Sequence, residues 1–160
     1  MSSNIAIQND SMLVIDNSLE NLLKQAVVST LCAESLDAPF EVSILFCSND
    51  EIHRLNMEYR GKDRPTDVLS FPIYDCREDL DDDVSLNQLA DFFALGDVVI
   101  APDVVSEAAV EIGDPFEKHL ARMCIHSVLH LIGYDHETSA EDERVMLEKQ
   151  EEILENFWKD

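Results

Sequence analysis

The segment HSVLHLIGYDH, residues 126–136, places three histidines around a single glycine. His126 and His130 are four residues apart, so on a helix their side chains lie on one face, about 5–6 Å apart. Gly133 can adopt the left-handed backbone that ends a helix and turns the chain back. That turn would bring His136 toward the first two rings. We therefore predict a single-metal site with His126, His130 and His136 as ligands.

The donor set indicates which ion this site binds. Three neutral imidazoles suit a borderline divalent ion such as zinc and leave a fourth coordination position for water or substrate. We expect one Zn²⁺ per chain. Asp135 is the nearest candidate for a fourth ligand, which would close the site and make the metal structural, whereas Cys124 should project from a different face of the helix.

Ser127 limits the chemistry of this site. The spacing of the three histidines is also that of the metzincin proteases, in which the residue after the first histidine is a glutamate that serves as general base. Serine cannot take a proton from metal-bound water at neutral pH, so a peptidase would need another base, such as Asp67 or Asp135. A substrate that carries its own nucleophile, as RNA does in its 2′-hydroxyl, would be less affected.

Hydrophobic periodicity outside this segment predicts an α/β fold, with short β-branched runs alternating with amphipathic helices. We see neither an internal repeat nor a linker, and we expect a single domain over residues 1–160. The predicted strands are residues 4–10, 41–47, 68–74 and 97–102, and the predicted helices are residues 17–30, 48–61, 103–113, 114–132 and 138–157.

Capping residues set the helix boundaries. We expect Asn17 to cap the first helix, Ser48 to open the second, and Asp114, followed by a proline, to cap the helix that carries His126 and His130. The last helix should begin within residues 138–141. Its buried stripe should contain Met146, Leu147, Ile153, Leu154 and Phe157.

The composition describes a compact globular chain, with 46% hydrophobic residues, but its formal charge is −23. Such acidity disfavours free nucleic acid, and no DNA partner is expected. Four of the eleven basic residues nevertheless lie within residues 54–64, whereas acid is concentrated in residues 75–83 and from residue 137 to the end. We expect residues 75–93 to form a flexible loop.

The sequence also bears on the cellular location of the protein. No signal peptide or membrane-spanning run is recognisable, so we expect a soluble, cytoplasmic protein. The four cysteines form no CxxC pair and are expected to be reduced and mostly buried. His53 and His119 lack neighbouring ligands, and we interpret both as ordinary histidines.

Together with LNMEYRGKDRPTDVLSFP (residues 55–72) and LGDVVIAP (residues 95–102), the histidine segment resembles the YbeY family of bacterial endoribonucleases and ribosomal RNA maturation factors. The resemblance implies a mixed α/β fold with a four-stranded sheet and about five helices. It also implies a zincin-like site with one zinc on His126, His130 and His136, and a functionally important arginine at Arg60. A guanidinium presents a planar fork that binds phosphate and could stabilise developing charge.

The function implied by the resemblance is metal-dependent cleavage of single-stranded RNA, in maturation of the small-subunit (16S) ribosomal RNA and ribosome quality control. The expected partners are the ribosomal RNA precursor and the small ribosomal subunit with its proteins, whose basic surfaces would suit an acidic protein. Two alternatives stay open. One is a ribosome-assembly factor with a structural metal and little nuclease activity, and the other is a different zinc hydrolase.

Overall fold

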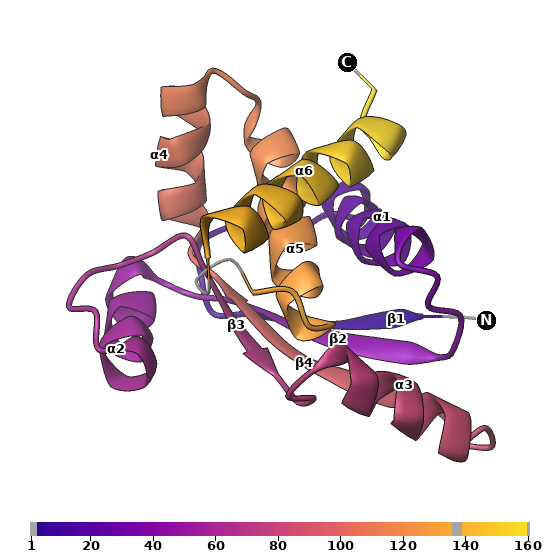
Figure 1. The fold of residues 1–160 in the computed structure, drawn as a ribbon. Coiled ribbons are helices and arrows are strands. Elements are labelled where there is room, and N and C mark those ends of the chain that lie inside the picture. Colours follow the sequence, from indigo (N-terminus) through magenta and orange to yellow (C-terminus); the bar gives the residue numbers. More distant parts are fainter. Residues whose placement is uncertain (1–2, 136–138, 160) are drawn as a thin grey trace.

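The structure, a computed structural model, describes residues 3–135 and 139–159. Within these ranges the chain forms four strands and six helices (Figure 1). In chain order they are β1 (Asn4–Asn9), α1 (Asn17–Ala33), β2 (Phe40–Phe46), α2 (Asn49–Arg60), β3 (Val68–Pro72), α3 (Arg77–Leu86), β4 (Phe93–Ile100), α4 (Pro102–Ile112), α5 (Phe116–Leu131) and α6 (Ala140–Phe157).

The four strands form one mixed sheet in the order β1-β2-β4-β3. Strands β1, β2 and β4 are parallel, and β3 runs antiparallel to β4 at the edge of the sheet. The predicted α/β fold with a four-stranded mixed sheet is confirmed. Strand β4 begins four residues before the predicted range, and the helix beyond the expected five is α3.

Helices α1, α5 and α6 lie on one side of the sheet, with α5 in contact with both of the others (Figure 1). The side chains of β4 alternate between the faces: Val98 and Ile100 join the main core under these helices, and Val99 points to the opposite face. There Val99 packs in a smaller cluster with Ile52 of α2. Helices α2 and α5 thus stand on opposite faces of the sheet, and both end near β3 (Figure 1).

The expectation of a flexible loop over residues 75–93 is wrong, because this segment contains α3. Leu80 is fully buried and packs into the main core. Tyr74 donates to Asp83 over 2.6 Å, and Arg77 Nη2 donates to the backbone carbonyl of Glu34 over 2.9 Å. One apolar anchor and these long-range hydrogen bonds hold the helix, while its acidic side chains remain in solvent.

Two predicted caps are also wrong. Asp16, one residue before Asn17, caps α1 by accepting from the backbone N–H of Leu19. The carboxylate of Asp114 does not cap α5, whose N-cap is Pro115; it pairs instead with Arg122 at 2.9 Å. A guanidinium that offers a charge-assisted hydrogen bond competes well with a backbone N–H.

Other boundaries are as predicted. Ser48 caps α2, and Gly61 ends that helix with φ +67°. Helix α4 ends at Gly113, which also has a positive φ. Ser139 caps α6 by accepting from the backbone N–H of Asp142.

Burial departs from expectation at a few positions. Met146, Ile153 and Leu154 are buried on α6, but Leu147 is 41% exposed. Cys47 and Cys124 are buried, whereas Cys32 and Cys76 are exposed, so burial of the cysteines is only half confirmed. None of the helices in the described ranges combines the length and apolarity that crossing a membrane requires.

Candidate functional site

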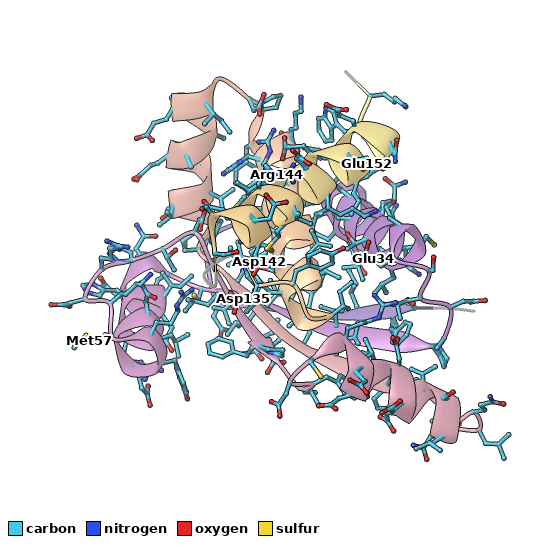
Figure 2. The ribbon with its side chains drawn as sticks, viewed as in Figure 1. Glu34, Met57, Asp135, Asp142, Arg144 and Glu152 are labelled. Carbon is cyan, nitrogen blue, oxygen red and sulfur yellow. The ribbon has the colours of Figure 1, made fainter. Side chains whose placement is uncertain are left out.

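A cleft of about 630 Å³ opens beside β3. One wall comes from the end of α2 and the following loop, with Arg60 and Lys62, and the other from the end of α5, with His126 and His130. Asp135, on the segment that leaves α5, also lines the cleft (Figure 2). The fold thus brings the Arg60 region and the histidine segment, more than 60 positions apart in the sequence, to one site.

His126 and His130 converge as their spacing predicts. Their ring centroids are 4.7 Å apart and their Nε2 atoms 3.2 Å apart. Zinc binds imidazole nitrogen at about 2.0–2.1 Å, and tetrahedral angles then place two such nitrogens roughly 3.3–3.4 Å apart. The spacing of the two Nε2 atoms therefore fits two ligands of one ion.

The hydrogen-bond partners of the two Nδ1 atoms determine whether each Nε2 atom carries a hydrogen or a lone pair. His126 Nδ1 lies 2.7 Å from the side-chain oxygen of Gln150, and His130 Nδ1 lies 2.8 Å from the backbone carbonyl of Tyr134. Carbonyl oxygens only accept, so both Nδ1 atoms donate, and each neutral ring has its lone pair on Nε2. Two lone pairs then face each other across 3.2 Å, an arrangement that is stabilised by a cation between them.

The turn after α5 forms as predicted. Gly133 has φ +115°, and the backbone N–H of Tyr134 donates to the carbonyl of Leu129 over 3.0 Å. A Cβ on Gly133 would lie 2.9 Å from the backbone nitrogen of Arg77, so α3 packs directly on this turn. The predicted third ligand, His136, lies outside the described residues. Among those described, no three His, Cys, Asp or Glu side chains form a metal-binding group.

Arg60 reaches the cleft because of how α2 ends. The left-handed Gly61 turns the chain, and the amide of buried Asn56 donates to the carbonyl of Arg64 over 2.9 Å. The backbone N–H of Lys62 donates to the carbonyl of Asn56 over 3.3 Å. These bonds hold the loop against α2, so that two cationic side chains stand on one wall of the cleft, in a protein of net charge −23.

The acid–base candidates differ in their surroundings. Asp67 lines the cleft, and its Oδ1 accepts from the backbone N–H of Val68 over 2.8 Å. Asp135 is exposed at the cleft rim. Ser127 is fully buried in α5, and its hydroxyl has no hydrogen-bond partner among the described residues. The position that would carry the metzincin glutamate therefore faces the core and not the cleft.

Cys124 and the two histidines interpreted as ordinary, His53 and His119, do not line the cleft. Cys124 is fully buried, and burial raises the pKa of its thiol to about 12. His53 pairs with Asp63 at 2.7 Å on the surface of α2. His119 is buried, and burial, with a smaller contribution from the charge of Arg122, lowers its pKa.

Sequence reasoning missed the buried amide that contacts the site. Gln150 of α6 is 4% exposed and makes the 2.7 Å contact with His126. Its signal in the sequence is a polar residue within an apolar stripe, since Met146, Gln150, Ile153 and Leu154 follow helical spacing on the buried face of α6. A lone amide in such a stripe needs a polar partner from elsewhere in the fold.

Comparisons with known proteins identify the family that the sequence resembles. The family model described as Endoribonuclease YbeY matches residues 4–158. A curated protein of that name from Caldanaerobacter subterraneus is 40% identical over 154 residues, covering 96% of this chain and 97% of the relative. One from Exiguobacterium sibiricum is 39% identical over 155 residues, covering 96% and 95%. The solution structure of a Thermotoga maritima protein is similar with a TM-score of 0.62 and 34% identity, covering 97% of this chain and 89% of that one.

Proposed function

The chain belongs to the YbeY family of endoribonucleases, which acts in ribosomal RNA maturation, and we propose that it is a zinc-dependent enzyme that cleaves single-stranded RNA in precursors of the small-subunit (16S) ribosomal RNA. The observation that carries this proposal is the pair of Nε2 atoms 3.2 Å apart on one wall of a cleft whose other wall carries Arg60 and Lys62. One wall suits a cation and the other suits a phosphate.

His126, His130 and His136 would hold the zinc. When bound, it supplies a Lewis acid that polarises a phosphoryl oxygen or lowers the pKa of a bound water. The two described ligands fit this role, because their outer nitrogens donate to carbonyl oxygens, as metal-ligating histidines commonly do.

Arg60 and Lys62 bind and orient the substrate in this proposal. A guanidinium contacts two phosphate oxygens at once, and an ammonium adds a point charge nearby. Both line the same cleft as the histidines, so in this proposal a phosphodiester bound there is contacted by these cations and by the zinc. These contacts strengthen as negative charge develops on the phosphate in the transition state. They accelerate the reaction because they bind the transition state more strongly than the ground state.

The nucleophile is proposed to be the 2′-hydroxyl of the RNA. Ser127 is buried and offers no base at the position that metzincins use. Asp67 and Asp135 are the carboxylates of the cleft, and either can accept the proton of a substrate hydroxyl. Attack by the 2′-oxygen on the adjacent phosphorus breaks the P–O5′ bond, so one product ends in a 2′,3′-cyclic phosphate and the other leaves with a 5′-hydroxyl after its oxygen takes up a proton. DNA, which lacks the 2′-hydroxyl, would not be cleaved.

The net charge of −23 shapes the proposed setting of the reaction. Long-range repulsion weakens encounter with free RNA, whereas the basic proteins of the small ribosomal subunit would attract this surface. We place the reaction in the cytoplasm, on RNA held in a precursor of that subunit.

The test incubates zinc-loaded protein with a single-stranded fragment of ribosomal RNA, with a matched DNA strand as control, after rigorous removal of contaminating ribonucleases. The expected result is RNA cleavage that needs His130, stops on chelation and leaves cyclic phosphate ends. Equal cleavage by the wild type and His130→Ala would refute the proposal. Zinc binding without cleavage, on isolated RNA or on precursor subunits, would favour an assembly factor with a structural metal, in which Asp135 could complete the site.

A further inference from the structure

Gln150 is the one polar residue of α6 that is buried among the described part of that helix. It shares its face with Met146 and Ile153, and its side-chain oxygen lies 2.7 Å from Nδ1 of His126, 24 positions earlier in the chain. Burying an amide is costly unless its polar atoms are hydrogen-bonded. The contact therefore points to a specific role for this amide at the histidine pair.

The orientation of the amide is determined by its other end. Gln150 Nε2 donates to Glu151 Oε2 over 3.0 Å, and Glu151 in turn accepts from Arg122 Nε, 3.1 Å from each carboxylate oxygen. Arg122 is held on its far side by Asp114 at 2.9 Å. Because the carboxylate of Glu151 can only accept, the NH₂ group of Gln150 must face it, and the oxygen must face His126.

The two histidines are thus held by different means. His130 Nδ1 donates to the carbonyl of Tyr134, a backbone atom of the turn that follows its own helix. His126 Nδ1 depends on a side chain from α6. If the acceptor on Gln150 were lost, His126 could carry its proton on Nε2 and donate it to Nε2 of His130, only 3.2 Å away. His126 Nε2 would then carry a hydrogen, and the lone pair of His130 Nε2 would be taken up by the hydrogen bond.

We propose that Gln150 is a positioning residue that keeps the proton of His126 on Nδ1 and so leaves Nε2 free of hydrogen to act as a ligand. Helix α6 then contributes to the metal-binding site through Gln150, which orients the ligand His126 but does not contact the metal. The inference rests on the proposed zinc site, but the tautomer it specifies exists without metal. Glu151 and Arg122 act on the same ring indirectly, by orienting the amide.

The experiment compares wild type with three variants. Gln150→Leu keeps a side chain of similar size and removes the acceptor. The double variant Gln150→Glu/Glu151→Gln keeps an acceptor facing His126 and an amide donor between positions 150 and 151. The matched control is Glu152→Leu, an exposed position toward the carboxyl-terminal end of α6, away from Asp135 in Figure 2. Three quantities are measured: the zinc dissociation constant by competition with a chromophoric chelator, the histidine tautomer from two-bond ¹H–¹⁵N spectra of metal-free protein at mildly alkaline pH, and the thermal midpoint of metal-free protein.

The expected result is a zinc affinity about 10–100-fold weaker in Gln150→Leu, which is the range typical of losing the partner of a metal-bound histidine. Metal-free Gln150→Leu should keep its thermal midpoint, and its His126 should lose the pure Nδ1–H tautomer of the wild type. Gln150→Glu/Glu151→Gln should recover most of the affinity, and Glu152→Leu should match wild type in all three quantities.

Several results would overturn the inference. One is an Nε2–H tautomer at His126 in the wild type, a measurement that needs no variant to fold. Another is Gln150→Leu with unchanged affinity, and a third is Gln150→Glu/Glu151→Gln that folds but binds zinc as weakly as Gln150→Leu. Failure of the wild type to bind zinc would instead refute the proposed metal site, and the wild-type tautomer would still decide the role of Gln150.

Discussion

The side-chain amide of Asn56, buried in α2, donates to the backbone carbonyl of Arg64 over 2.9 Å and so holds the loop that follows Arg60. The same residue accepts from the backbone N–H of Lys62 through its own carbonyl. One buried amide therefore couples the stability of α2 to the placement of the cationic wall of the cleft.

We predict that Asn56→Leu lowers the free energy of unfolding by about 1–3 kcal/mol, because it leaves the loop carbonyl without its partner. Urea unfolding of zinc-loaded protein measures the loss. The control is Asn21→Leu at an exposed position of α1, which should change stability by less than about 0.5 kcal/mol. Equal stability of Asn56→Leu and wild type would show that the loop is held by other contacts.

His130→Ala should abolish stoichiometric zinc binding, because two of the three proposed ligands cannot hold the ion alone. Zinc stabilises the folded state by about 2.7 kcal/mol when its concentration is 100 times its dissociation constant. Chelation should therefore lower the thermal midpoint of the wild type and leave that of His130→Ala unchanged. Zinc content by metal analysis and thermal scans with and without chelator check both points. One zinc per chain in purified His130→Ala would remove this residue from the ligand set.

Arg60→Ala should retain zinc binding and fold stability but lower RNA cleavage by about 10²–10³-fold, the range typical of losing one group that stabilises transition-state charge. Single-turnover cleavage at saturating protein measures the chemical step. The matched control is Arg144→Ala, an exposed arginine of α6 whose ion pairs with Glu141 and Glu148 lie outside the cleft. If both variants cleave at the same rate, Arg60 has no specific role.

Among glycine-to-alanine substitutions outside the histidine segment, Gly96→Ala should be the most destabilising. Gly96 in β4 has φ +138°, and a Cβ there would lie 2.3 Å from the carbonyl oxygen of Phe71 on β3, so the strand pair must move apart. Gly113→Ala also meets a positive φ, but its Cβ would have no atom within 4 Å. We expect about 1–3 kcal/mol from backbone strain at Gly113 and a larger loss at Gly96. Denaturant midpoints that rank the two in the opposite order would contradict this account of the β3–β4 contact.

His119 should make stability depend on pH below neutrality. Burial lowers its pKa from the ordinary value of 6.5, and the charge of Arg122 lowers it further, so the unfolded chain binds a proton more readily than the folded protein. Stability from this group is therefore present above about pH 6.5 and declines as pH falls below it. His119→Phe should lose this part of the pH dependence. The check is the difference in unfolding free energy between wild type and His119→Phe, each at several pH values from 7.5 to 5.5. A difference that stays constant with pH would exclude His119 as the source.

Patterns within a few residues were sufficient to predict much of this protein. The i, i+4 spacing of His126 and His130 places two rings on one helix face, and the glycine after α5 turns the chain, because both follow from backbone geometry alone. Alternating and helical hydrophobic patterns predicted four strands and five of the helices for the same reason. The resemblance to the family came from residues within three such short segments.

Other features were decided by contacts that form only in the folded chain. Helix α3 exists because Leu80 reaches the main core and Arg77 reaches Glu34, and Asp114 leaves its predicted capping role because Arg122 offers a stronger partner. Gln150 contacts His126 only because α6 packs on α5. Local sequence sets backbone propensity, but the free energy of a buried polar group depends on a partner that tertiary structure alone brings within hydrogen-bonding distance.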